Sequence, residues 1–404
     1  MSAVAEASPR VADRWRLFII LAGLYLAQSI PSYLFAAALP PILRQSGVSR
    51  SAIGLIAILF IPLVLKFLWA PYIDRFRPLA RRHRAGWIII TQTATICCLV
   101  ALAFVDPTRI GVVLTIGMAV SVLVSTQDIA TDGYATKNLA PEDRGIGNAI
   151  QGGAIAIGVV LGGMLALMLY DRIGWTATVL IVAAVSALPL IAAFAMRERD
   201  PQGQAATAKR PSILAFLKRP EAREILIIAL VYRASEGLVK SMEGPYLVDR
   251  GVPLDWIGYI SGGGAVTAGL GGAAIAALLL RRLGNGSVLT LLGALRTLCF
   301  LLFALHALGV VTGYVPLFGA ALFQTLIRYM EIVALYSLFM SVSSSDQPGT
   351  DFTVLACAQL IVYLAGSMVA GILADLLGYG ALFLLATAIS AIAVAVTAKL
   401  LLRQ

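Results

Sequence analysis

Charged side chains stand inside long apolar stretches of this chain, where a charge is costly. One stretch carries four of them at spacings of three, four and three residues: Arg233, Glu236, Lys240 and Glu243. At 100° per residue these positions span an arc of about 80° on a helix, so one face can hold them all away from lipid. A second stretch carries Arg328 and Glu331 one turn apart. Both stretches are therefore candidate functional helices.

Two chemistries suit these residue types. Guanidinium groups bind carboxylates and similar anions, which makes Arg233 and Arg328 candidate substrate-binding residues. A carboxylate beside a guanidinium stays ionised until the substrate claims its partner, after which it can accept a proton. The candidates for proton coupling are Glu236, Glu331, Glu243 and Asp128. The helical spacing predicts Glu236 beside Arg233, and Glu331 beside Arg328.

A structural interpretation stands beside the functional one. Buried ion pairs can hold helices together or close a gate without touching a substrate. We assign this structural role to Arg296 and leave both interpretations open for the other charges. Uncharged polar residues add candidate ligand contacts: Tyr25 and Gln28 precede Pro31 at helical spacing, and Gln324 precedes Arg328 by one turn. Pro31 alone would explain a local kink there.

The elements that position these residues are membrane spans. A hydrophobic fraction of 59%, only 13% charged residues and a mean hydropathy of +0.89 exclude an ordinary soluble domain. A helical span needs about 20 mostly apolar residues. Twelve stretches of this kind lie at about 17–40, 52–71, 86–105, 110–134, 145–169, 175–196, 223–247, 257–280, 287–308, 313–340, 350–374 and 379–401. The predicted fold class is an all-α membrane protein.

The second half of the chain repeats the first. Gly162 and Asp171 recur 204 residues later as Gly366 and Asp375, and the same offset of 204 residues aligns further identical residues in two separate stretches. The sequence therefore predicts two pseudo-symmetric six-helix bundles, 1–196 and 223–404, joined by a polar cytoplasmic linker at 197–222. Parallel halves of this kind are typical of transporters that hold a substrate near mid-membrane.

The positions of Lys and Arg predict the orientation. Five of the 31 fall in outer loops, Arg44, Arg50, Arg109, Arg172 and Arg250, whereas most lie in the loops on the other side. Both termini are therefore expected in the cytoplasm. The net charge of +10 reflects this distribution, so we expect no nucleic-acid partner. The first residues lack the apolar core of a cleavable signal peptide.

No residue pattern favours a cofactor, a metal or an enzyme. The four cysteines lie in predicted spans without metal-ligand spacing, and neither His83 nor His306 adjoins a recognisable nucleophile or acidic cluster. No P-loop is present, so we expect transport driven by an ion gradient, most simply of protons. The expected partners are a small-molecule substrate, protons and the lipid bilayer, and we expect a monomer.

Two motifs carry a family resemblance. The segment KFLWAPYIDR closes the second span at 66–75, and STQDIATDGY closes the fourth at 125–134. With twelve spans in two halves, the chain resembles the major facilitator superfamily, and in these motifs its AmpG-type branch, which includes muropeptide permeases, acetyl-CoA transporters and the RhtX/FptX siderophore importers. Because both motifs lie at the cytoplasmic face, we expect a gate there formed by Lys66, Asp74, Arg75 and Asp132, with Lys66 paired to Asp128.

The chain length points within this branch to the RhtX/FptX group, because AmpG permeases commonly carry two additional hydrophobic segments. That resemblance implies proton-coupled import of a siderophore or its metal complex across the bacterial inner membrane by alternating access. The alternative is an AmpG-like permease for muropeptides or another amphiphilic anion. The motifs identify the branch and leave the substrate open.

Overall fold

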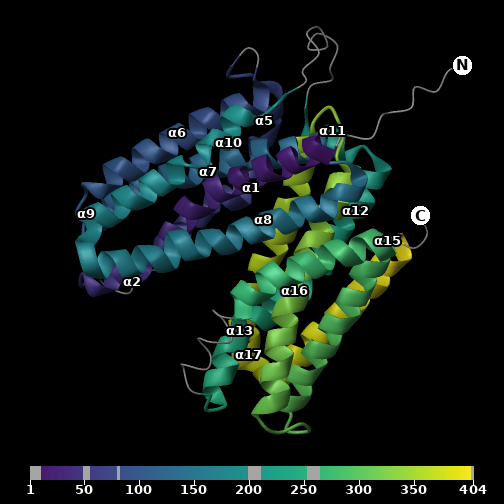
Figure 1. Cartoon of the computed structure of the whole chain (residues 1–404). Helices are drawn as coiled ribbons and strands as arrows, with labels where there is room; N and C mark the ends of the chain where they lie inside the picture. The colour runs from purple at the N-terminus through teal and green to yellow at the C-terminus, as the bar shows by residue number, and fades with distance from the viewer. Residues whose placement is uncertain (1–10, 49–54, 80–81, 199–210, 253–263, 402–404) are drawn as a thin grey trace, which may run out of the picture. The chain divides into compact units, whose positions relative to one another are not determined.

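The computed structural model is built from helices throughout the residues that it describes, which are 11–48, 55–79, 82–198, 211–252 and 264–401 (Figure 1). Part of the predicted linker, 199–210, and the first part of the predicted span at 257–280 lie outside these ranges. The all-α fold class is confirmed.

Seven helical stretches of the described chain are long and apolar enough to cross a membrane. Three of them, Pro141–Ala195, Thr267–Ala307 and Pro348–Leu401, contain 55, 41 and 54 residues. At 1.5 Å per residue, each is far longer than a bilayer core of about 30 Å. Each is interrupted by one glycine with non-helical backbone angles, at Gly174, Gly284 and Gly378. These three stretches therefore hold two predicted spans each.

The interrupting glycines also display the internal repeat. Gly174 and Gly378, which the sequence repeat aligns, have φ values of 76° and 77°. The aligned pair Gly47 and Gly251 has φ values of 85° and 77°. Left-handed backbone of this kind is open to glycine and costly for other residues, so the repeat preserves turns and not only apolar composition.

The chain forms two compact units. The first consists of Met1–Leu59, Arg77–Thr131 and Ile157–Gln202. Its elements are α1 (Val11–Tyr33), the π-helical η1 (Leu34–Ala38), α2 (Leu39–Gln45), η2 (Leu55–Phe60), α6 (His83–Ala103), most of α7 (Ile110–Asn138), the π-helical η5 (Val159–Met164), α9 (Leu165–Ala187) and α10 (Leu190–Ala195). Pro31 lies near the end of α1, directly before the π-helical turn.

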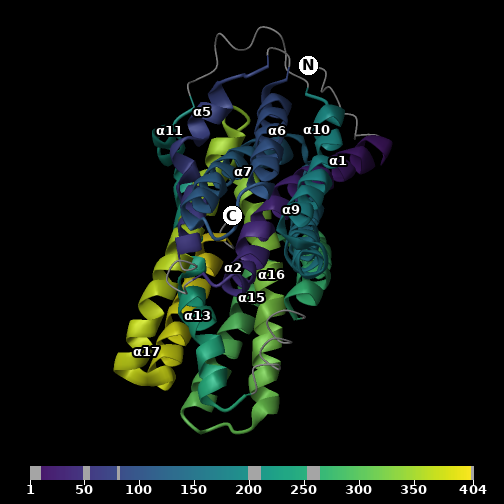
Figure 2. The ribbon, with the colours of Figure 1, turned by 90° about the vertical axis from the view of Figure 1, so that its left-hand side faces the viewer.

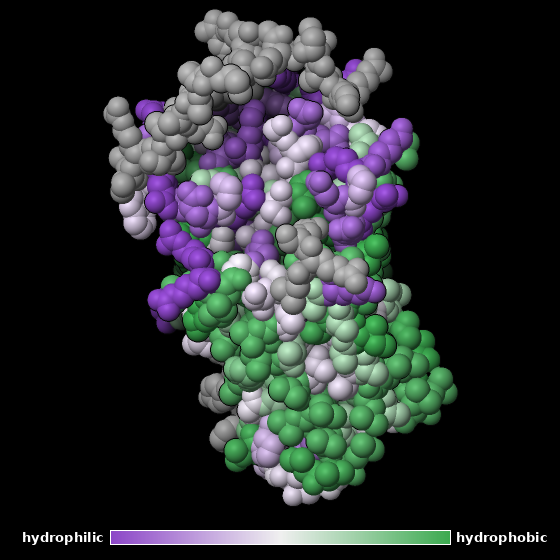
Figure 3. Space-filling view, turned by 90° about the vertical axis from the view of Figure 1, so that its right-hand side faces the viewer, coloured by the Kyte–Doolittle hydropathy of each residue, from purple (hydrophilic) through white to green (hydrophobic). Residues whose placement is uncertain are grey.

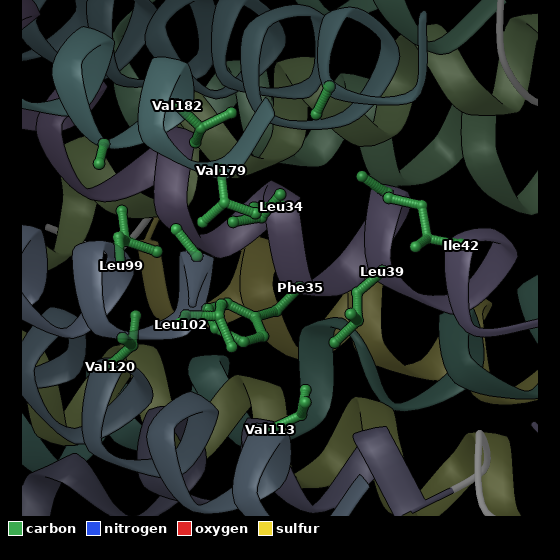
Figure 4. Close-up of a cluster of buried hydrophobic side chains, with 14 of the residues drawn as sticks. Leu34, Phe35, Leu39, Ile42, Leu99, Leu102, Val113, Val120, Val179 and Val182 are labelled. Atoms are coloured by element: carbon green, nitrogen blue, oxygen red, sulfur yellow. The ribbon is translucent and has the colours of Figure 1, made fainter. Parts of the chain in front are cut away.

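Apolar side chains from several helical segments fill the core of the first unit (Figure 4). Phe35 of η1 and Leu39 of α2 meet Leu102 of α6, Val113 of α7 and Val179 of α9 within this buried cluster. The Trp175 indole also donates to the Leu102 carbonyl at 3.2 Å. Burial of these groups stabilises the unit without using a polar residue of the predicted site.

The second unit consists of Phe60–Phe76, Asp132–Ala156 and Gly203–Gln404. Its elements are α4 (Ile61–Leu65), η3 (Lys66–Leu68), α5 (Ala70–Arg75), η4 (Pro141–Asp143), α8 (Arg144–Gly158), α11 (Ile213–Leu217), α12 (Pro220–Tyr232), α13 (Ala234–Asp249), α15 (Gly264–Ala307), α16 (Tyr314–Val342) and α17 (Pro348–Leu401). Helix α13 lies along α17, as Figures 1 and 2 show.

Equivalent glycines let helices approach closely in both units. A Cβ on Gly162 would lie 2.1 Å from the Ile30 carbonyl oxygen, and one on Gly366 would lie 3.2 Å from the Ala234 carbonyl oxygen. The sequence repeat relates both partners of one contact to both partners of the other. Small residues at such crossings allow van der Waals packing between membrane helices. The repeat thus extends to helix packing.

The two compact units do not coincide with the two halves of the sequence repeat. Residues 60–76 and 132–156 come from the first half of the sequence but belong to the second unit. One reason is that α5 packs on the start of α17, where the Asp74 carboxylate contacts Thr350. The predicted domains 1–196 and 223–404 describe the repeat, and their independence as bundles stays a prediction.

The surface of the second unit carries large apolar side chains. In Figure 3 they cover much of the lower part of the view, where Figure 1 places α13 and α15–α17. On α15, Leu278 and Leu298 are more than half exposed. Exposed apolar area on this scale suits contact with lipid.

Candidate functional site

The predicted charged helix is interrupted at its first charge. Arg233 separates α12 from α13, with φ −101° and ψ 9°, and Glu236 lies in the first turn of α13. The Arg233 guanidinium donates through Nε and Nη2 to the two Glu236 carboxylate oxygens, the second bond at 2.7 Å. Both side chains are buried. The predicted Arg233–Glu236 pair is therefore present, and it is bidentate.

A second arginine shares the same carboxylate. Arg328 Nε of α16 lies 2.8 Å from Glu236 Oε1. Both guanidinium carbons, of Arg233 and Arg328, lie 5.4 Å from the centre of the Tyr363 ring on α17. The Arg328 side chain is 29% exposed, against 9% for Arg233. Two cations thus share one carboxylate and one aromatic face, and Arg328 is the more accessible of the two.

The second predicted pair is wrong. Glu331 Oε2 is bound by Arg296 Nη1 of α15 at 3.0 Å, whereas Arg328 is bound to Glu236. Residues three apart on a helix can pair, but here stronger partners stand on neighbouring helices. The Arg296 guanidinium also lies 4.5 Å from the Tyr232 ring centre. Arg296, predicted to be structural, is thus the ion partner of a proton-coupling candidate.

The Tyr232 hydroxyl faces two acceptors. It lies 2.9 Å from Glu331 Oε1 and 2.7 Å from the Leu289 carbonyl oxygen. A phenol has one proton, so it cannot donate fully to both when Glu331 is ionised. A protonated Glu331 could donate to the Tyr232 oxygen, which would leave the Tyr232 proton to Leu289. The geometry therefore suits both charge states of Glu331.

The remaining charges of the stripe form a local pair. Lys240 Nζ lies 3.0 and 3.1 Å from the two oxygens of the buried Glu243 carboxylate, one turn along α13. The charged cluster holds four cations and three anions. The cations are Arg233, Arg296, Arg328 and Lys240, and the anions are Glu236, Glu243 and Glu331. With all its groups ionised it carries one net positive charge, which suits an anionic ligand.

The predicted uncharged contacts are all buried. Gln324 of α16 is 1% exposed, and neither of its side-chain amide atoms has a hydrogen-bond partner among the described residues. In the first unit, Tyr25 and Gln28 are buried on α1, and the Gln28 side-chain oxygen likewise has no partner in the described chain.

The predicted gate residues fall in both units. Asp74 of α5 accepts hydrogen bonds from the Thr350 backbone N–H at 2.6 Å and from its hydroxyl at 2.8 Å. Thr350 lies in the first turn of α17, where free N–H groups favour a carboxylate. Arg75 is exposed, and Lys66 and Asp132 are buried. Asp128 is half-buried in the first unit, and its pairing with Lys66 stays a prediction.

Sequence reasoning missed an ion pair at the same end of α17. The buried Asp351 carboxylate is bound by Arg219 at 2.5 Å and accepts from Ser344 and Gln347. It also missed the aromatic partners, Tyr232 and Tyr363. An acidic residue at the start of an apolar span could have indicated Asp351. Nothing in the spacing indicates which tyrosines face the arginines.

The family that the chain matches makes it a multi-pass membrane transporter, not an enzyme. Residues 17–358 match the Major Facilitator Superfamily, and the chain belongs to that family. Within it, the chain is similar to an anhydromuropeptide permease and to a putative transporter named AmpG 4. It is 26% identical over 378 residues to the anhydromuropeptide permease of Escherichia coli strain K12, covering 91% of this chain and 76% of the permease.

Further relatives and structures agree on family and fold. A putative transporter AmpG 4 of Rickettsia felis is 22% identical over 391 residues, covering 92% of each chain. A bacterial homologue of the iron transporter ferroportin, in an outward-facing state, has a TM-score of 0.72 at 17% identity and covers 95% of this chain and 98% of that one. The transporter FucP in its outward conformation has a TM-score of 0.73 at 16% identity, with 95% and 97% covered. These two structures show the fold alone.

Proposed function

We propose that the protein is a secondary carrier of the bacterial inner membrane that moves a muropeptide or a similar amphiphilic anion by alternating access. The named relatives favour this substrate over the siderophore that the chain length suggested. A muropeptide is a sugar-linked peptide whose carboxylates are anionic at neutral pH. The positive-inside distribution of Lys and Arg supports cytoplasmic termini.

The observation that carries the proposal is the sharing of Glu236 by two arginines. Arg233 binds this carboxylate with two hydrogen bonds, and Arg328 forms an ion pair with it. A ligand carboxylate can therefore take Arg328 as its partner while Glu236 keeps Arg233. Arg328 is also the arginine of the pair with greater exposure, which makes it the first contact for an arriving anion.

The test is uptake of a radiolabelled anhydromuropeptide into proteoliposomes. Because an ionic contact left unpaired costs about 2–5 kcal/mol, Arg328→Gln is expected to lower the apparent affinity at least tenfold. Arg328→Lys should retain part of the affinity, since the charge stays and the planar geometry is lost. Arg282→Gln, at an exposed arginine of α15, is the control. Unchanged affinity in Arg328→Gln would contradict the proposal.

Proton coupling is the second part of the proposal, and the contacts distinguish its two main candidates. Glu236 is held by two guanidinium groups, an arrangement that favours the ionised carboxylate. Glu331 has one guanidinium and a tyrosine whose single proton has two acceptors. We therefore assign proton uptake to Glu331. Glu236 is assigned the role of neutralising the two arginines when no substrate is bound.

The cytoplasmic gate completes the proposed cycle. The Asp74 carboxylate at the N-terminal turn of α17 forms a contact that must break if α5 and α17 separate. Lys66 and Asp128, one from each of the two sequence motifs, are proposed as a second latch. Asp132 and Arg75 are assigned to the same gate.

A further inference from the structure

Gln324 has an unmet capacity for hydrogen bonding. The side chain is 1% exposed, and neither its oxygen nor its nitrogen has a partner in the described part of the chain. Buried amides of native proteins are nearly always bonded, so such a group requires a specific explanation. The neighbouring Thr325 shows the usual arrangement, since its hydroxyl donates to the Ala321 carbonyl at 2.9 Å.

The position of Gln324 relates it to the anion site. Gln324 and Arg328 are four residues apart on α16, which places them about 40° apart on one face and about 6 Å, slightly more than one turn, apart along the axis. Two other buried oxygens without partners in the described chain belong to residues close in sequence to residues of the anion site. Ser235 Oγ lies next to Glu236 in sequence, and Gln359 Oε1 precedes Tyr363 by one turn.

A side-chain amide offers one acceptor and a donor group, which is the complement of a peptide bond. Successive residues of an extended peptide are separated by about 3.3–3.6 Å, so one helical turn spans one to two residues. A ligand whose carboxylate binds Arg328 would therefore bring a peptide group near Gln324. A siderophore or fatty anion without an amide there would leave the Gln324 amide unpaired.

We infer that Gln324 forms an amide subsite, and that the substrate carries a peptide bond within one or two residues of the carboxylate bound by Arg328. This inference rests on the proposed function and narrows it to a peptide-containing anion. The subsite would select by rejection, because a ligand that lacks the amide leaves buried donors and acceptors unmatched.

The test compares two probes of equal charge on the purified full-length protein. One is an anhydromuropeptide and the other is its ester analogue, in which an oxygen replaces the N–H of the peptide bond nearest the carboxylate. Equilibrium binding gives a Kd for each. The unaltered protein is expected to bind the peptide about tenfold more tightly, the effect of one unmatched buried polar group. Gln324→Leu should bind both probes with nearly equal Kd.

Two further variants keep the result interpretable. Gln324→Met preserves side-chain length and replaces Gln324→Leu if the latter fails to elute as a folded protein. Thr325→Val removes a hydroxyl that its own helix already satisfies, and it should keep the tenfold preference. A preference retained in both Gln324 variants, or equal binding by the unaltered protein, overturns the amide subsite alone. Binding of neither probe overturns the proposed function and the subsite with it.

Discussion

Two buried carboxylates of the cluster differ in their partners. Glu236 receives two hydrogen bonds from Arg233 and forms an ion pair with Arg328. Glu331 receives one hydrogen bond from Arg296, and the Tyr232 hydroxyl near it also faces the Leu289 carbonyl. The number of fixed positive charges around a carboxylate decides how firmly its ionised form is held. These residues should therefore respond differently to the same substitution.

Glu331→Gln is expected to abolish uphill uptake driven by a proton gradient while leaving exchange of labelled for unlabelled substrate intact. Gln resembles the protonated acid and cannot release a proton, so the carrier keeps its binding site but loses coupling. Glu236→Gln should instead weaken both activities, because it frees two cations. Full gradient-driven uptake in both variants would show that neither carboxylate couples protons.

The sequence predicted the charged residues of the site better than their contacts. Ionisable residues inside apolar stretches stand out because insertion penalises them, so Arg233, Glu236, Arg328 and Glu331 were identifiable. Spacing along one helix reveals neighbours on that helix alone. The pairing of Glu331 with Arg296 joins α16 to α15, and only the folded structure shows which stronger partner wins.

At the scale of elements, α13 packs closely against α17, and Arg233 at the start of α13 lies near Tyr363 of α17. A Cβ on Gly237 would lie 2.1 Å from the Tyr363 carbonyl oxygen, a distance that forces the helices apart. Gly237 follows Glu236 directly, so any displacement there moves the ion pair as well.

Gly237→Ala is expected to lower the stability of the folded protein by about 1–3 kcal/mol, the usual cost of overpacking. It should also weaken substrate binding, since α13 carries the site. Gly244→Ala on the same helix is the control, because a Cβ there has no atom of the described chain within 4 Å. Thermal unfolding in detergent measures both variants. Equal unfolding temperatures would show that the contact tolerates a methyl group.

The proposed cytoplasmic gate involves residues of three elements, α5, η3 and α7. If Lys66 and Asp128 form one latch, the double variant Lys66→Met/Asp128→Asn should lose less transport than the sum of the losses of the two single variants. Expressed as a free energy, the difference should be about 0.5–3 kcal/mol. Initial uptake rates at equal protein levels provide the measurement. Strictly additive effects would mean that the two residues act independently.

For the whole molecule, the sequence predicted the class of fold because long apolar stretches have few structural solutions in a membrane. The repeat predicted the two halves, and aligned glycines such as Gly174 and Gly378 share nearly the same positive φ. The grouping of 60–76 with the second unit was not predictable, because it depends on the contact of Asp74 with Thr350. The length of the chain was also not sufficient to predict which substrate the protein carries.

The single surplus cation of the cluster has an electrical consequence. In the empty carrier the cluster, with its carboxylates ionised, holds one net positive charge. With a monovalent anion bound and one proton on Glu331, the cluster and its ligand together hold the same charge. The membrane voltage acts on a moving charge with about 2.3 kcal/mol per 100 mV. Because the charge is equal in both forms, the voltage acts equally on the reorientation of the loaded and of the empty carrier. Over a full cycle it therefore drives no net transport. The pH difference across the membrane would then supply the whole driving force for a monovalent substrate.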